Sequence, residues 1–164
     1  MANASTGTMH TVYWIAAAIF VFDQVTKLYV LHVIDLDVLR DYPIFPPFLQ
    51  LQMAWNHGIN FGLMASNAQW MRWVLIAVAL GIAIWVAIWI RSESRPAARV
   101  AAGLLIGGAV GNVVDRIAYG AVADFLNMSC CGITNPYSFN VADIAIFAGA
   151  IGLILFTGER RNTA

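Results

Sequence analysis

Nine polar residues lie within or at the ends of the most apolar stretches of this chain. They are Asp23, Lys27, Asn56, Asn112, Asp115, Arg116, Asp124, Asn140 and Asp143. A charged side chain at the centre of a lipid bilayer costs at least about 2.5 to 3.5 kcal/mol, so such residues are usually paired or functional. We expect these nine residues to converge on one site.

The charges in this set do not balance. Four carboxylates, those of Asp23, Asp115, Asp124 and Asp143, accompany only two cations, Lys27 and Arg116. Lys27 follows Asp23 by four residues and shares its helix face, so it is expected to neutralise that carboxylate. If Arg116 belongs with Asp115, the carboxylates of Asp124 and Asp143 have no basic partner.

Two unpaired carboxylates in a low-dielectric site cannot both ionise, so they share a proton and their pKa values separate. This is the chemistry of an aspartyl hydrolase: one carboxylate activates a water and the protonated one polarises the scissile carbonyl. Asp143 and Asn140 begin a predicted helix, whose N-terminus favours an ionised carboxylate, so Asp124 is the expected acid. Charge counting alone leaves two other interpretations open: ion pairs that hold helices together, and a proton or ion relay.

Composition places the protein in a membrane. Of 164 residues, 60% are hydrophobic and only 11% are charged, and the mean hydropathy is +0.72. A soluble domain needs more charge to cover its surface. We expect one membrane domain over residues 1–164. The net charge of zero gives no reason to expect a nucleic acid partner.

Metal and cofactor chemistry are not expected. The two cysteines, Cys130 and Cys131, are adjacent, and the three histidines are scattered along the chain. No spacing typical of a metal site exists among these residues.

Four segments are long and apolar enough to be membrane spans. They are residues 13–33, 68–90, 97–114 and 139–157. Arginines gather between the second and third spans and after the fourth, so the positive-inside rule puts both termini in the cytoplasm. The polar set then lies in the outer half of the membrane or at its outer edge.

The outer loop at residues 36–67 contains an alternating pattern. In residues 48–55, Leu49, Leu51, Met53 and Trp55 share one face, which predicts an amphipathic strand. An open sheet edge cannot lie in hydrocarbon, so we expect a small sheet at the outer interface, where it could hold an extended peptide. A loop that rests on the membrane is the alternative.

Five motifs resemble the lipoprotein signal peptidase (signal peptidase II) family along nearly the whole chain. They are Asp23–Lys27 (DQVTK), Asn56–Gly62 (NHGINFG), Gly107–Arg116 (GGAVGNVVDR), Val122–Phe125 (VADF) and Phe139–Asp143 (FNVAD). The resemblance implies an all-α membrane protein with four transmembrane helices and a small β-sheet at the periplasmic interface. It implies a bacterial inner-membrane endopeptidase that removes signal peptides from prolipoproteins.

The resemblance also implies the details of the reaction. Cleavage is expected on the N-terminal side of a diacylglyceryl-modified cysteine, with Asp124 and Asp143 catalytic and the other seven polar residues supporting them or positioning substrate. Phospholipid surrounds the expected enzyme, which has no metal and is a monomer. The rival functions are a proton-coupled small transporter and a structural membrane subunit.

Two residues depart from the family's motifs, and two further segments have predicted roles of their own. Asn60 stands where the family has a small apolar residue, and Ala123 stands where valine is common. The segment 126–138 is predicted to be a mobile lid because of its glycine and proline content. The Gly107, Gly108 and Gly111 cluster is predicted to allow close helix packing rather than to bind phosphate.

Overall fold

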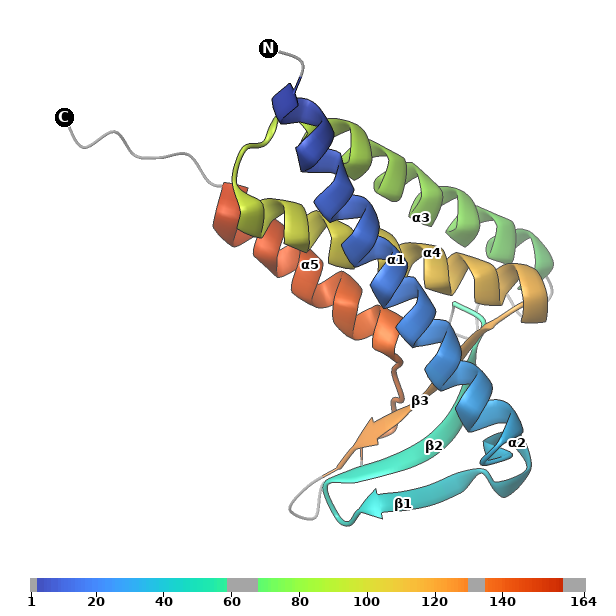
Figure 1. The fold of residues 1–164 in the computed structure, drawn as a ribbon. Helices are drawn as coiled ribbons and strands as arrows, with labels where there is room; N and C mark the ends of the chain where they lie inside the picture. The colour runs from blue at the N-terminus through green and yellow to red at the C-terminus, as the bar shows by residue number, and fades with distance from the viewer. Residues whose placement is uncertain (1–2, 59–67, 130–134, 158–164) are drawn as a thin grey trace.

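The computed structural model describes residues 3–58, 68–129 and 135–157, and it describes side chains from residue 9 onward. Four helices form a bundle, and a three-stranded sheet lies at the end opposite the two termini (Figure 1). The elements are α1 (Asn3–His32), α2 (Leu36–Leu39), β1 (Asp41–Phe45), β2 (Leu49–Asn56), α3 (Ala68–Trp89), η2 (Ile90–Ser92), α4 (Pro96–Tyr119), β3 (Val122–Met128) and α5 (Val141–Thr157).

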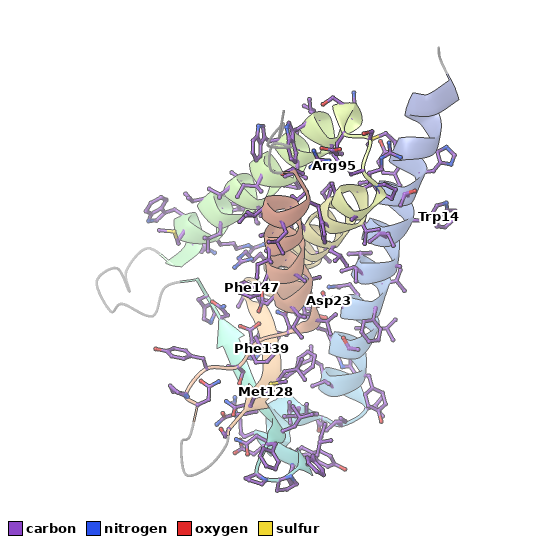
Figure 2. The ribbon with its side chains drawn as sticks, turned by 90° about the vertical axis from the view of Figure 1, so that its left-hand side faces the viewer. Trp14, Asp23, Arg95, Met128, Phe139 and Phe147 are labelled. Carbon is purple, nitrogen blue, oxygen red and sulfur yellow. The ribbon has the colours of Figure 1, made fainter. Side chains whose placement is uncertain are left out.

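The four expected spans correspond to α1, α3, α4 and α5. Within the described residues, three helices are long and apolar enough to cross a membrane, and α5 is a shorter apolar helix of 17 residues. Large apolar side chains are exposed on the outside of the bundle: Trp14, for example, projects from α1 and is 74% exposed (Figure 2). Such a surface matches lipid and not water as its surroundings.

The third predicted span lies within a longer helix. It was expected to stop at Val114, before two charged residues, but α4 continues to Tyr119. Asp115 is 1% exposed, so its charge lies inside the bundle and does not end the helix. The helix ends where Gly120 adopts the left-handed conformation, with φ of 82°.

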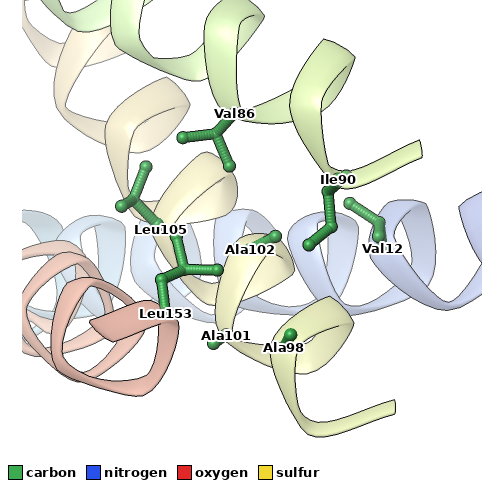
Figure 3. Close-up of a cluster of buried hydrophobic side chains, with 8 residues drawn as sticks. All are labelled: Val12, Val86, Ile90, Ala98, Ala101, Ala102, Leu105 and Leu153. Carbon is green, nitrogen blue, oxygen red and sulfur yellow. The ribbon is translucent and has the colours of Figure 1, made fainter. Parts of the chain in front are cut away.

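Glycines allow α4 to pack against α1 and α5. A Cβ on Gly107 would lie 2.5 Å from the carbonyl oxygen of Ala16 in α1, and a Cβ on Gly108 would lie 2.4 Å from that of Ala142 in α5. The predicted packing role of these glycines is therefore confirmed. Near the first turns of α4, an apolar cluster that includes Val12, Val86 and Leu153 contains side chains from α1, α3, α4 and α5 (Figure 3).

The sheet has the order β1-β2-β3, and both pairs are antiparallel. The predicted strand at residues 48–55 is confirmed as β2, and its Leu51 and Met53 are buried against the end of α1. β3 was not predicted. It runs beside β2 and carries Asp124, which is paired with Ala54 across the ladder.

Candidate active site

Asp124 and Asp143 come from different elements and meet at Asn140. Asp124 lies on β3, and Asp143 lies in the first turn of α5. Asn140 immediately precedes α5 and is fully buried. Its side-chain amide donates to Asp124 Oδ1 at 2.6 Å, and its backbone N–H donates to Asp143 Oδ2 at 3.3 Å.

Local sequence explains the position of Asp143. Asn140 Oδ1 accepts the backbone N–H of Asp143 at 2.9 Å, while the Asp143 carboxylate reaches back to the backbone N–H of Asn140. This reciprocal pair is a capping box, which satisfies two backbone donors at the start of α5. Asp143 is also held by Asn112 of α4, whose Nδ2 donates to Oδ1 at 2.8 Å.

Asp124 is only 3% exposed. Burial, followed by repulsion from the nearby Asp143 charge, raises the pKa of Asp124 from 3.8 to about 7. Hydrogen bonds donated by Asn56, at 3.0 Å to Oδ2, and by Asn140 oppose this rise. Asp124 can therefore hold a proton near neutral pH.

The two aspartates have no close basic partner. Within the described part of the chain, no Lys or Arg nitrogen lies within 4.0 Å of either carboxylate. The Arg116 charge is near enough to interact electrostatically with both. Asp124 and Asp143 are therefore the two carboxylates of the set that lack a salt bridge in the described chain.

The predicted pairing of Arg116 with Asp115 is wrong. Lys27 contacts both remaining carboxylates, with Nζ 2.7 Å from Asp23 Oδ2 and 2.7 Å from Asp115 Oδ2. Arg116 instead donates from Nη1 to the carbonyl oxygen of Asn112 at 3.2 Å. Adjacent helical residues point in different directions, so Asp115 faces α1 while Arg116 does not.

All nine predicted residues belong to one hydrogen-bonded network. Asn112 connects its two parts, because its Oδ1 accepts from Lys27 at 3.3 Å and from Asn140 at 3.3 Å.

Gln24 belongs to the same network but was not among the predicted residues. Its Nε2 lies 3.1 Å from Asp23 Oδ2 and 3.0 Å from Asp115 Oδ1. The sequence did contain a signal for Gln24: it is an amide side chain inside an apolar span, next to Asp23.

Two cavities flank this network. A groove of about 440 Å³ lies between α3, α4 and α5, is lined mainly by apolar residues such as Leu75 and Ile146, and has Asn112 and Arg116 in its wall. A smaller pocket of about 210 Å³ lies against the sheet and is lined by Asp124, Asn56 and Tyr137 among others. The two cavities therefore differ in polarity.

Part of the predicted lid is a strand. Leu126 to Met128 belong to β3, and Phe139 pairs with Leu126 through two backbone hydrogen bonds of 2.8 and 3.0 Å. Asn60, Cys130 and Cys131 lie outside the described residues. The lid stays a prediction.

Comparisons with known proteins agree with the motifs. The model of the family described as "Signal peptidase (SPase) II" matches residues 15–158. Two proteins named "Lipoprotein signal peptidase" are similar over most of their length. The one from Methylobacterium sp. (strain 4-46) is 42% identical over 91% of this chain and 90% of the relative. The one from Pelagibacter ubique is 38% identical over 90% of each.

Solved structures share the fold. One, described as a bacterial membrane enzyme structure at 1.9 Å resolution, is 25% identical over 94% of this chain and 95% of the other, with a TM-score of 0.77. Another with the same description, at 2.3 Å resolution, has a TM-score of 0.73 at 23% identity and 94% coverage of both chains. The family match covers most of the chain and includes all nine polar residues. The chain therefore belongs to the signal peptidase II family.

Proposed function

We propose that this protein is an aspartyl endopeptidase that removes the signal peptides of prolipoproteins in a bacterial inner membrane. Cleavage occurs on the N-terminal side of a cysteine that carries diacylglycerol. The observation that supports this most directly is the pair of aspartates, Asp124 and Asp143, which share the donor Asn140 and have no close basic partner in the described chain. The family and the names of its relatives support the substrate class.

The two carboxylates have different roles in the proposed reaction. Asp143, at the N-terminus of α5 and hydrogen-bonded by Asn112, is the ionised base that takes a proton from water. Asp124, whose pKa is about 7, is protonated and donates to the scissile carbonyl oxygen. The water oxygen bonds to the carbonyl carbon and gives a tetrahedral intermediate. This intermediate collapses when Asp143 passes the proton it took from water to the leaving amine and Asp124 takes its proton back from the intermediate's hydroxyl.

The apolar groove supports a route for the substrate. The hydrophobic segment of the signal peptide enters laterally from lipid and lies between α3 and α5, with its end near Asn112 and Arg116. The diacylglyceryl tails stay among the phospholipids, where their apolar surface contributes affinity. We also propose that the enzyme is a monomer with both termini in the cytoplasm and the site towards the periplasm.

Substitution of either aspartate tests this proposal. Asp124→Asn and Asp143→Asn keep the size of the side chain but remove one ionisable group each. Both variants should insert in the membrane, elute from a sizing column like the wild type and cleave at least about 10³-fold more slowly, because base and acid both act in the rate-limiting step.

The assay is the gel shift of a diacylglyceryl-modified precursor incubated with detergent-purified protein and a chelator. Wild-type cleavage that survives the chelator supports aspartyl chemistry. Loss of wild-type cleavage on chelation, or rates near wild type in either variant, contradicts it.

A further inference from the structure

The buried ion pairs of Lys27 end at the backbone that carries the proposed catalytic pair. Asp23 Oδ1 accepts the backbone N–H of Ala142 at 2.9 Å, and Asp115 Oδ2 accepts the backbone N–H of Ala123 at 3.3 Å. Ala142 immediately precedes Asp143, and Ala123 immediately precedes Asp124. A continuous chain of contacts therefore runs from one aspartate-bearing segment to the other through Lys27.

Gln24 provides a second connection between the same two carboxylates. Its Nε2 contacts Asp23 Oδ2, Asp115 Oδ1 and, at 3.4 Å, the carbonyl oxygen of Gly111. A Cβ on Gly111 would lie 2.6 Å from Asp23 Oδ2, so the absence of a side chain there leaves room for the carboxylate. None of Asp23, Gln24 or Asp115 has a hydrogen bond to Asp124 or Asp143 in the described chain.

We infer that Asp23, Gln24, Lys27 and Asp115 form a positioning clamp that sets the separation of the two aspartates. The inference rests on the proposed function. Because the clamp holds the backbone on both sides, a small change within it alters the distance between the carboxylates. Catalysis is sensitive to such errors: a misplacement of about 1 Å can cost about 100-fold in rate. A shared proton is equally sensitive to that distance.

Gln24 gives the sharpest test, because its loss leaves both ion pairs of Lys27 in place. Gln24→Leu should lower kcat about tenfold or more with KM nearly unchanged, since no groove contact is lost. It should also shift the alkaline limb of the pH–rate profile. Gln24→Glu should do the same, because a third carboxylate cannot donate to the other two.

The control is Thr26→Val. Among the described residues, Thr26 Oγ1 donates only to carbonyls of its own helix, those of Phe22 at 3.0 Å and Asp23 at 2.8 Å. This variant loses a side-chain hydrogen bond on the same helix and should keep the wild-type profile.

A purely structural role would give another result. If Gln24→Leu lowers the melting temperature but keeps kcat and the pH profile, the clamp is wrong. The pH dependence of the melting temperature reports the titration of Asp124 without any cleavage. It should differ between Gln24→Leu and wild type, and an unchanged dependence contradicts the clamp. Absence of wild-type cleavage would instead overturn the proposed function.

A separate observation concerns the small pocket beside the sheet. It is lined by the catalytic candidate Asp124, by Ala54 and Asn56 of β2, and by Tyr137 and Ser138. Its volume of about 210 Å³ is that of roughly seven water molecules at about 30 Å³ each. Asp124 lines this pocket but does not line the apolar groove.

We propose that this pocket binds the residue that follows the acylated cysteine, again on the basis of the proposed function. The signal peptide precedes the scissile bond and needs the apolar groove, so the polar pocket is left for the chain that follows the bond. Ala54 and Tyr137 both line the pocket, so the sizes of their side chains limit the size of the residue that fits.

Two substitutions should change this selectivity in opposite directions. Ala54→Leu fills the pocket and should lower kcat/KM for a precursor with phenylalanine after the cysteine, relative to one with glycine, by about tenfold. Tyr137→Ala enlarges the pocket and should raise that ratio. Ala79→Leu, which fills the apolar groove, should affect both precursors equally.

The test of the pocket is the ratio of kcat/KM for the phenylalanine precursor to kcat/KM for the glycine precursor. If neither pocket variant changes the ratio, or if Ala79→Leu changes it equally, the pocket does not bind this residue. Wild-type protein that cleaves neither precursor would contradict the proposed function rather than the subsite.

Discussion

A single residue, Asn140, contacts both members of the proposed catalytic pair. Its amide nitrogen donates to Asp124, its amide oxygen caps α5, and its backbone N–H meets Asp143. A fully buried amide with these contacts has little freedom to rotate, so it fixes both carboxylates at once. An aspartate in place of Asn140 would add a third negative charge to the site.

Removal of the Asn140 side chain is expected to impair chemistry more than binding. Asn140→Ala removes a hydrogen bond that holds down the pKa of Asp124, so that pKa should rise above about 7. The alkaline limb of the pH–rate profile should move to higher pH while kcat falls, and the lost cap should cost about 1 kcal/mol of stability. Steady-state kinetics over pH 5 to 9 would measure this. A limb that moves to lower pH would contradict it.

Asp124 should also make stability depend on pH. Its pKa is about 7 in the folded protein and 3.8 as the ordinary value, so between these values the folded state holds a proton that the unfolded chain has lost. The free energy of unfolding should therefore decrease as pH rises from about 4 to about 7.

Asp124→Asn isolates this contribution, because the variant lacks the titration. Relative to wild type, it should gain stability as pH rises through the same window, by an amount on the order of a few kcal/mol. Melting curves of both proteins in one detergent would test the sign. A difference that is constant with pH would show that Asp124 does not titrate there.

At the scale of elements, α4 organises the molecule. It contributes the Asn112, Asp115 and Arg116 side chains, and its glycines allow α1 and α5 to approach closely. This close approach brings Asp23 of α1 within reach of the start of α5. The site therefore depends on backbone packing as well as on polar side chains.

Gly107→Ala should loosen the contact between α1 and α4. The new Cβ would lie 2.5 Å from the backbone oxygen of Ala16, which side-chain rotation cannot relieve. We expect a loss of about 1 to 3 kcal/mol, typical of overpacking. Gly81→Ala in α3 is the matched control, because nothing lies within 4 Å of its Cβ position. Equal melting temperatures for the two variants in detergent would contradict this role of Gly107.

At the scale of the whole molecule, the sheet and the termini lie at opposite ends of the bundle (Figure 1). The cationic turn at η2 is at the same end as the termini, since η2 packs against the first part of α1. By the positive-inside rule, we expect that end in the cytoplasm and the sheet on the outer side of the membrane.

Labelling of single cysteines would test this orientation. In a background with Cys130→Ser and Cys131→Ser, the Asp41→Cys variant should react with a membrane-impermeant maleimide in intact spheroplasts. The Ser94→Cys variant should react only after lysis. Both Asp41 and Ser94 are exposed. The reverse pattern of labelling would show the opposite topology.

Local features of the sequence were enough to predict the four apolar helices of the bundle and β2. Hydropathy and the alternation around Leu51 and Met53 are properties of neighbouring residues, so they can be read without a structure. A count of charges predicted that two of the four carboxylates lack a basic partner. It reached Asp124 and Asp143 through a pairing of Arg116 with Asp115 that the structure does not contain.

Only the tertiary structure decided which partners these charges have. Lys27 binds Asp115, which is 88 positions away (115 − 27), and Gln24 reaches the same residue across 91 positions. Such contacts depend on which faces of α1 and α4 meet, and that is set by glycine packing along the whole interface. β3 was not predicted because most of its residues are buried on both faces of the strand. Its sequence therefore lacks the alternation of polar and apolar residues that would indicate a strand.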